Sequence, residues 1–169
     1  MRKVKLFIFS LLFASLFVGC IERYDYEGCH KPIYLSYEKL RSDYPKILSP
    51  REIDKAGKIY IYGDTLLVNE KNIGIHIIDN RVKETPIQKY FIELPGNIDM
   101  AIKNGYLYVD SYIDLIVLDI RDIDNIVEIK SARKEGIFPY DHQQSISKED
   151  LEKERCGYDE NRGIVIGYK

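Results

Sequence analysis

The chain has 169 residues, with 25 basic and 27 acidic side chains, 45% hydrophobic residues, 14 Tyr, three Cys and no Trp. This length fits one domain or slightly more, and the hydrophobic content is that of an ordinary globular protein. The composition excludes wholesale disorder, collagen-like repeats and a membrane protein with many spans. A net charge of −2 argues against a nucleic-acid partner held by phosphate contacts, and three Cys are too few for a disulfide scaffold.

Residues 1–19 have the layout of a bacterial secretory signal. Met1–Lys5 carries three basic side chains, and Leu6–Gly19 is apolar or small throughout except for two Ser. A transmembrane anchor is the alternative interpretation. However, the fourteen residues of the apolar segment span only about 21 Å as a helix, whereas the hydrocarbon core of a bilayer is roughly 30 Å thick. We therefore expect a signal peptide and not a membrane-spanning anchor.

The end of this segment, Phe17-Val18-Gly19-Cys20, resembles the lipobox of bacterial lipoproteins. In that family a small residue precedes a Cys that is lipid-modified and becomes the new N-terminus, so the resemblance implies lipidation of Cys20. Phe17 stands where the family usually has Leu, which is a mild departure. Each buried CH₂ of an acyl chain adds roughly 0.8 kcal/mol, so several chains on one Cys would hold the protein on the membrane. Ile21 follows the Cys instead of Asp, and by resemblance to enterobacterial sorting this implies the outer membrane.

Cleavage before Cys20 changes both length and charge. It removes three basic side chains and no acidic one, which leaves 150 residues with a net charge of −5. The other two thiols belong to Cys29 and Cys156, and in an oxidising compartment they could form a disulfide. Two unpaired Cys remain the alternative, because the sequence carries no information on the distance between them.

The middle of the chain repeats itself at an interval of 40 residues. The identical pairs at this offset are Leu67/Leu107, Ile73/Ile113, Asp79/Asp119 and Arg81/Arg121. Each unit holds four short β-rich runs separated by turn residues. The runs are 59–62, 66–69, 75–79 and 87–94 in the first unit, and 98–102, 106–110, 115–120 and 126–130 in the second. Asn104-Gly105 is a hairpin signal, because both residues tolerate a positive φ.

Four short strands in about 40 residues are typical of one β-propeller blade. The third run of each unit, Ile75–Asp79 and Leu115–Asp119, is nearly continuous in apolar residues, which suits a strand buried on both faces. The Asp that ends each of these runs is expected to bond nearby backbone N–H groups in a turn. The predicted fold is therefore all-β, with two four-stranded propeller-like blades that form a partial β-propeller, and with short helical flanks.

The segment Leu115-Ile-Val-Leu-Asp119 resembles the signature of the LVIVD-repeat family of bacterial β-propeller proteins, and Ile75–Asp79 is a looser copy. The segments Gly57–Ile61 and Tyr106–Val109 also resemble members of this family. The resemblance covers residues 56–130, which is half of the chain after Cys20. The family has no agreed activity, so the resemblance implies a fold and an envelope location but no catalytic residues.

The predicted organisation follows from these observations. It comprises a signal peptide (1–19), a tether (20–32), an N-terminal flank (33–55), two blade-like units (56–95 and 96–135) and a C-terminal flank (136–169). In the flanks, Leu35–Asp43 is expected to form a helix with Ser36 as its N-cap, and Ser147–Arg155 a second helix. Gly163–Lys169 is predicted to be a strand without a hairpin partner, which would leave an exposed edge.

Histidine residues give no sign of a metal site. His30, His76 and His142 are far apart and share no metal-ligand spacing with Cys. His76 lies inside a predicted buried strand, at the position where the second unit has Ile116. We therefore interpret His76 as a partly buried structural residue.

Acidic and nucleophilic residues are equally uninformative about chemistry. Asp110, Asp114 and Asp119 are close enough in sequence to suggest calcium, but they lack the EF-hand pattern, so we expect all three to serve in turns. The sequence contains neither a Gly-x-Ser-x-Gly elbow nor a P-loop. It therefore predicts no catalytic residues, no cofactor, no metal site and no enzymatic activity.

Several Tyr lie in or beside the predicted strands, namely Tyr60, Tyr62, Tyr106, Tyr108 and Tyr112. Ordinary strand packing is the expected role for them. The alternative is a surface that binds a glycan or a peptide, because Tyr combines an apolar body with a polar tip and is enriched at interfaces.

A closed propeller typically has four to eight blades, whereas this chain offers two. Three arrangements remain open: an open stack of two sheets covered by the flanks, several copies that together complete a propeller, or a shortened relative of a longer propeller. Self-association through the incomplete propeller is accordingly one expectation.

The expected function is that of a non-enzymatic binding or scaffold module of the bacterial cell envelope. Its predicted partners are the membrane, through the lipid anchor, and an unknown protein or glycan, but no nucleic acid. The alternatives are a truncated remnant of a longer propeller lipoprotein, and an envelope hydrolase or accessory domain.

Overall fold

The computed structural model describes residues 31–139 and 159–169. The predicted signal peptide, most of the tether and the predicted helix at 147–155 lie outside these ranges. So do His30, His142 and all three Cys. The described chain is mostly β and contains three antiparallel sheets, none of them closed. Within the two described ranges, every helix is too short or too polar to cross a bilayer.

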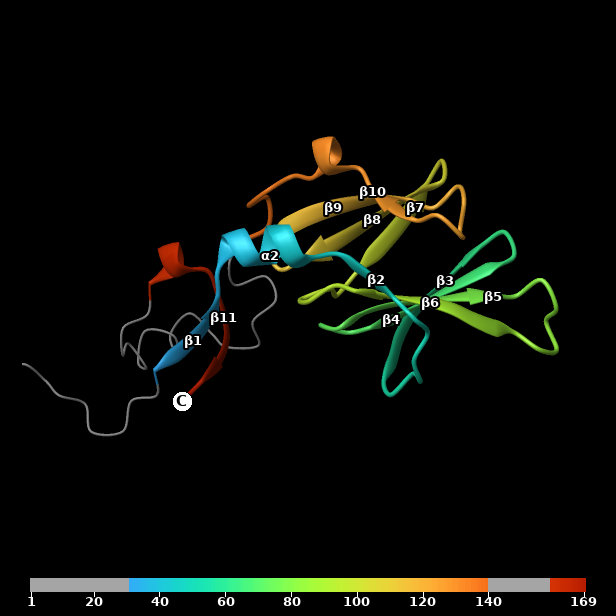
Figure 1. Cartoon of the computed structure of the whole chain (residues 1–169), viewed down its shortest axis with the longest axis horizontal. Coiled ribbons are helices and arrows are strands. Elements are labelled where there is room, and N and C mark those ends of the chain that lie inside the picture. Colours follow the sequence, from blue (N-terminus) through green and yellow to red (C-terminus); the bar gives the residue numbers. More distant parts are fainter. Residues whose placement is uncertain (1–30, 140–158) are drawn as a thin grey trace, which may run out of the picture.

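The largest sheet has five strands in the order β2-β6-β5-β4-β3 (Figure 1). They are β2 (Lys46–Leu48), β3 (Ala56–Tyr62), β4 (Thr65–Glu70), β5 (Gly74–Asp79) and β6 (Ile87–Glu93). The last four confirm the four runs predicted for the first unit. The expectation of a four-stranded sheet is wrong by one strand, because β2 pairs with β6. This strand has three residues between Pro45 and Pro50, which is too short for an alternating pattern to reveal it.

The second sheet has four strands in the order β10-β9-β8-β7. They are β7 (Met100–Lys103), β8 (Tyr106–Ser111), β9 (Asp114–Asp119) and β10 (Val127–Glu128), and they confirm the four runs predicted for the second unit. Asn104 and Gly105 form the two-residue turn between β7 and β8, with φ values of 52° and 80°. The hairpin predicted from this dipeptide is therefore confirmed. A short 3-10 helix, η2 (Lys130–Ala132), follows β10.

The flanks form a separate two-stranded sheet from opposite ends of the chain (Figure 1). In it, β1 (Pro32–Leu35) pairs antiparallel with β11 (Ile164–Tyr168), which follows the 3-10 helix η4 (Glu160–Arg162). The prediction that the last strand has no partner is therefore wrong. Its partner is a four-residue strand about 130 positions upstream, and local periodicity carries no information on such a pairing.

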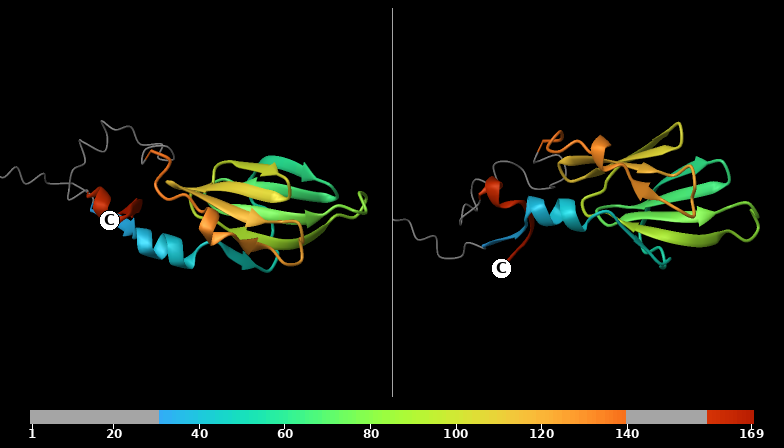
Figure 2. Two further views of the ribbon diagram at one scale, coloured as in Figure 1. Left: turned by 90° about the horizontal axis from the view of Figure 1, so that it is seen from above. Right: turned by 45° about the horizontal axis from the view of Figure 1, so that its top comes forward.

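The predicted N-terminal helix is confirmed as α2 (Tyr37–Asp43), which starts two residues later than expected. The Ser36 side chain is the N-cap, as predicted, and accepts a hydrogen bond of 3.2 Å from the backbone N–H of Lys39. Figure 2 shows α2 at the end of the stacked sheets that lies nearest to β1 and β11.

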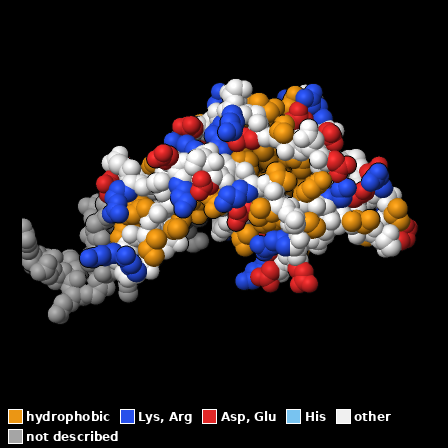
Figure 3. All heavy atoms as spheres, in the orientation of Figure 1, with side chains coloured by type: hydrophobic (Ala, Val, Ile, Leu, Met, Phe, Trp, Pro, Cys, Tyr) orange, Lys and Arg blue, Asp and Glu red, His pale blue; other side chains and the backbone are white. Residues whose placement is uncertain are grey.

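The two larger sheets stack with their faces together, and the hydrophobic core lies between them (Figures 1 and 2). On the face drawn in Figure 3, hydrophobic side chains gather along the seam between the sheets. The buried side chains of this core are Leu67, Ile75, Ile77, Ile92, Leu94, Met100, Leu107, Val109, Ile116, Leu118, Ile120 and Ile126. Both sheets contribute, so neither buries its apolar face without the other.

One glycine in the first sheet is required by a close backbone approach. Gly74 begins β5 with φ of 156°, and a Cβ there would overlap the backbone oxygen of Ile92 in the neighbouring β6. We expect Gly74→Ala to lower the free energy of unfolding by about 3 kcal/mol, from backbone strain plus overpacking. Urea denaturation followed by circular dichroism measures this loss.

Gly63→Ala is the matched control for this prediction. Gly63 also has a positive φ, 57°, but a Cβ would meet nothing within 4 Å. Only the left-handed conformation then costs energy, about 1 kcal/mol. Equal losses for the two variants would contradict the steric explanation.

Candidate functional site

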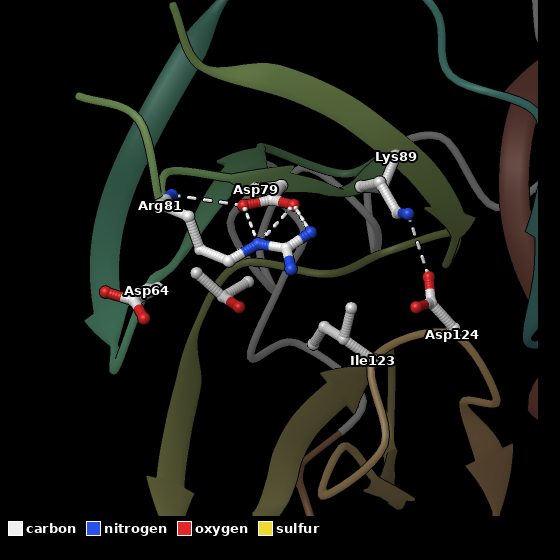
Figure 4. Close-up of a pocket in the computed structure, with 7 residues that line it drawn as sticks. Asp64, Asp79, Arg81, Lys89, Ile123 and Asp124 are labelled. Atoms are coloured by element: carbon white, nitrogen blue, oxygen red, sulfur yellow. Dashed lines mark hydrogen bonds and ion pairs between the residues drawn. The ribbon is translucent and has the colours of Figure 1, made fainter. Parts of the chain in front are cut away.

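A polar pocket of about 150 Å³ opens at the seam between the two large sheets (Figure 4). Its walls come from the β3–β4 turn, the ends of β4 and β5, strand β6, and the β9–β10 loop. The lining residues are Asp64, Thr65, Asp79, Arg81, Lys89, Ile123 and Asp124. Since both sheets contribute residues, the pocket exists only when the sheets are stacked.

Asp79 and Arg81 form an ion pair in the wall of this pocket. The Asp79 carboxylate accepts the backbone N–H of Arg81 at 3.0 Å and the guanidinium Nε of the same residue at 2.9 Å. These hydrogen bonds lower the pKa of Asp79 to about 2. The backbone contact confirms the predicted turn role of this Asp, whereas its ion pair with Arg81 was not predicted.

Lys89 and Asp124 form a second ion pair, which joins the first sheet to the second. The Lys89 Nζ lies 2.9 Å from the Asp124 carboxylate, and the Tyr90 hydroxyl donates to the same carboxylate at 3.4 Å. The Lys89 hydrogen bond lowers the pKa of Asp124, and the reciprocal contact raises the pKa of Lys89. Both cations that line the pocket are therefore paired with carboxylates, so an anionic ligand would have to compete with Asp79 or Asp124.

The second sheet has the same ion pair at the corresponding place. Asp119 accepts the backbone N–H of Arg121 at 3.1 Å and its Nε at 2.9 Å, which confirms the predicted turn role. The Arg121 hydrogen bonds lower the pKa of Asp119. This pair lines a shallower hollow of about 340 Å³ beside Val127.

Matching contacts reveal how the two sheets are oriented. In β5 the core-facing residues are Ile75 and Ile77, and Asp79, two positions further on, lies on the same face. In β9 the core-facing residues are Ile116 and Leu118, and Asp119 lies on the opposite face. Corresponding residues therefore lie on the same face of each sheet, but this face points into the core in the first sheet and outward in the second. The first sheet therefore packs one face against the non-equivalent face of the second sheet, so that equivalent faces of both sheets point in the same direction.

The offset between corresponding residues changes within the unit. The two-residue turns Gly63-Asp64 and Asn104-Gly105 align at an offset of 41. The next loop has three residues between β4 and β5 but two between β8 and β9, so the offset becomes 40 afterwards. The predicted alignment of Leu67 with Leu107 is thus wrong by one residue, because a loop insertion is invisible in a fixed-period comparison. The alignment of Asp79 with Asp119 holds.

A fully buried carboxylate, Glu70, holds the segment that enters the first sheet. It accepts the backbone N–H groups of Asp54 at 2.9 Å and Lys55 at 3.1 Å, and lies 2.8 Å from the guanidinium of Arg51. Burial raises the pKa of Glu70, but the hydrogen bonds from His76, Lys55 and Asp54, with the charge of Arg51, outweigh it and leave the pKa below its ordinary value.

Asp110 does the same for the second sheet. Its Oδ1 accepts the backbone N–H groups of Ile98 and Asp99, both at 2.9 Å, and the side-chain amide of Asn97 at 2.8 Å. The prediction that Asp110 serves a turn is therefore wrong, since its partners lie 11 to 13 residues upstream. In both sheets a buried carboxylate positions the backbone that leads into the first strand.

His76 is structural, as predicted, but it is fully buried and not partly buried. Its Nε2 lies 3.0 Å from the Glu70 carboxylate and donates to it, and its ring lies 4.7 Å from the ring of Phe91. The buried Nδ1 has no hydrogen-bond partner among the described residues. Burial is deeper than expected because the Glu70 carboxylate satisfies the polar edge of the ring.

Asp114 connects the N-terminal flank to the second sheet. Its fully buried carboxylate accepts Nε and Nη2 of Arg41 at 2.9 and 3.1 Å and the backbone N–H of Gly136 at 2.8 Å. Arg133 lies 3.7 Å away. The predicted turn role is wrong for this residue too, because Arg41 is 73 positions upstream, on α2.

The Tyr residues serve mainly in packing. Tyr60 and Tyr62 lie against the hydrophobic core, and the Arg121 guanidinium lies 5.1 Å from the centre of the Tyr106 ring. Tyr112 occupies the β8–β9 turn with φ of 54°. Tyr60 and Tyr62 belong to β3, and Tyr106, Tyr108 and Tyr112 belong to the second sheet or its turns.

The site residues predicted from sequence, Cys20, Cys29 and Cys156, all lie outside the described residues. In the part of the chain that is described, no group of three or more His, Cys, Asp or Glu is placed to hold a metal ion. No family model, curated protein or solved structure matches this chain.

Proposed function

We propose that this chain is a lipid-anchored protein of the bacterial cell envelope, which combines an acylated Cys20 with a non-enzymatic binding or scaffold module. The observation that carries the proposal is Phe17–Cys20, which resembles a lipobox and follows a basic and then an apolar segment. Ile21 after the Cys favours the outer membrane.

The stacking of the two sheets supports the proposal that the part of the chain after the lipid anchor is a module built from repeats. The Asp79–Arg81 and Asp119–Arg121 pairs and the common direction of the sheets are what successive propeller repeats would produce. We therefore interpret the two sheets as LVIVD-type repeats in an open stack.

The use of the polar side chains also suits a binding or scaffold module. In the described residues, Glu70, Asp110 and Asp114 each stabilise a connection between segments, and both cations of the pocket are paired. Such groups shape and rigidify a surface, which is what recognition by a preformed module requires.

Lipidation of Cys20 is tested by labelling cells with radioactive palmitate. We expect label on the wild-type chain, none on Cys20→Ala, and undiminished label on Cys29→Ala, which is the control for loss of a nearby thiol. Equal incorporation by the wild type and Cys20→Ala would refute lipidation at this position.

The absence of catalysis is tested separately, by incubating the purified protein with arrays of glycans and peptides. We expect saturable binding without chemical change of the bound molecule. Turnover of any bound glycan or peptide would show that the module is an enzyme.

A further inference from the structure

The outer face of the first sheet, turned away from the core, exposes large apolar side chains. Ile59 and Ile61 on β3 are 60% and 73% exposed. By strand pairing they lie opposite Val68 and Leu66 of β4, and Ile78 of β5 continues the same face. Val68 and Ile78 are themselves buried, at 5% and 7% exposed, and Leu66 is half-buried, so the exposed apolar surface of this face is formed by Ile59 and Ile61. Neighbouring exposed apolar residues mark interaction sites more often than isolated ones do.

These residues correspond to the interior residues of the second sheet. At the offsets given above, Ile59, Ile61, Leu66, Val68 and Ile78 correspond to Met100, Ile102, Leu107, Val109 and Leu118. All five members of the second set belong to the core between the sheets or pack against it. The outer face of the first sheet therefore has the same apolar pattern as the inner face of the second sheet. The first sheet covers that inner face.

We infer that this face binds the outer face of the second sheet of another copy of the chain, so that copies associate head to tail. The inference rests on the proposed interpretation of the two sheets as repeats. On the outer face of the second sheet, Val127 is 48% exposed, Tyr108 and Leu115 are half-buried, and Val117 is 5% exposed. The interface between copies would then continue the sheet-to-sheet interface that exists within one chain.

Charge complementarity supports this pairing of faces. Within the chain, Tyr62 lies against the β7–β8 turn, with its hydroxyl 3.3 Å from the position that a Cβ of Gly105 would occupy. The residue that corresponds to Tyr62 is Lys103, and the residue that corresponds to Gly105 is Asp64. The same contact between two copies brings exposed Lys103 to exposed Asp64 of the next copy, which are opposite charges.

A head-to-tail interface produces a closed ring if the rotation between copies closes. Each copy contributes two sheets, and closed propellers have four to eight, so the expected assembly contains two to four copies.

Sedimentation velocity of the full chain, extracted from membranes in detergent, tests the inference. We expect the wild type to sediment as two to four copies and Ile61→Lys as a single chain with an unchanged circular dichroism spectrum. Ile166→Lys is the matched control, because Ile166 is 53% exposed but lies on β11, away from both faces, so it should leave the assembly intact.

Charge exchange tests which surfaces meet. We expect Lys103→Asp and Asp64→Lys each to weaken association about fivefold or more, and the double variant to regain it, because only residues that meet can compensate each other. A wild type that is monomeric at every concentration, or single variants that the double variant does not rescue, would overturn the inference.

Two further outcomes are also decisive. If Ile61→Lys unfolds a monomeric chain, a segment of the same chain covers this face and the inference is wrong. If the wild type incorporates palmitate but sediments as a monomer, the head-to-tail association fails while the proposed lipid anchor stands.

Discussion

Replacement of Asp114 by Asn is expected to lower the free energy of unfolding by about 3 kcal/mol. The carboxylate is fully buried and is shared by Arg41, Arg133 and the backbone N–H of Gly136, so the variant leaves two guanidinium groups without their common anion. We place the loss at the low end of the range for broken buried pairs, because the Arg41 side chain is 27% exposed. Urea denaturation at pH 7 measures it.

Asp119→Asn is the control for this prediction. Its carboxylate also pairs with an Arg, but the Arg121 side chain is 62% exposed, so solvent screens the pair and the expected loss is much smaller. If the two variants lost equal stability, the Asp114 cluster could not be what connects α2 to the second sheet.

Replacement of Glu70 by Gln is the second large effect, with an expected loss of about 2–4 kcal/mol at pH 7. Glu70 is the acceptor for two backbone N–H groups, His76 and Arg51, and an amide cannot satisfy all four donors. Glu93→Gln is the matched control, because Glu93 is partly exposed and its contact with Lys46 is long, at 3.7 Å.

The Glu70 contribution also depends on pH in a defined direction. Because the pKa of Glu70 is lower in the folded protein than the ordinary value of 4.5, its ionised form is stabilising above about pH 4.5. That stability is lost as the pH falls through the lower, folded-state pKa. The difference in stability between the wild type and Glu70→Gln should therefore be constant above pH 5 and shrink towards pH 3. A difference that grows on acidification would contradict the assignment.

Local patterns predicted the strands of the two large sheets well. Short apolar runs such as Ile75–Asp79, bounded by turn residues, carry the strand signal in their own sequence, and Asn104-Gly105 carries the turn signal. Pairings between distant segments have no such local signal. The strand pair β1 and β11, the added strand β2 and the Arg41–Asp114 contact were therefore missed.

The candidate site was predicted only in part, for the same reason. Asp79 was identified as a turn residue, but its ion pair with Arg81 was not, although the identical spacing of Asp119 and Arg121 was a usable signal. Lys89 and Asp124 meet only because the two sheets stack, and no spacing along the chain indicates that contact.

The most direct test of the account is native mass spectrometry of the full chain after extraction from membranes in detergent. It measures the mass of each chain and the number of chains in the assembly at once. We predict chains that begin at Cys20 and carry the mass of acyl groups, in assemblies of two to four copies. Unmodified chains that still contain residues 1–19 and remain single would contradict the account.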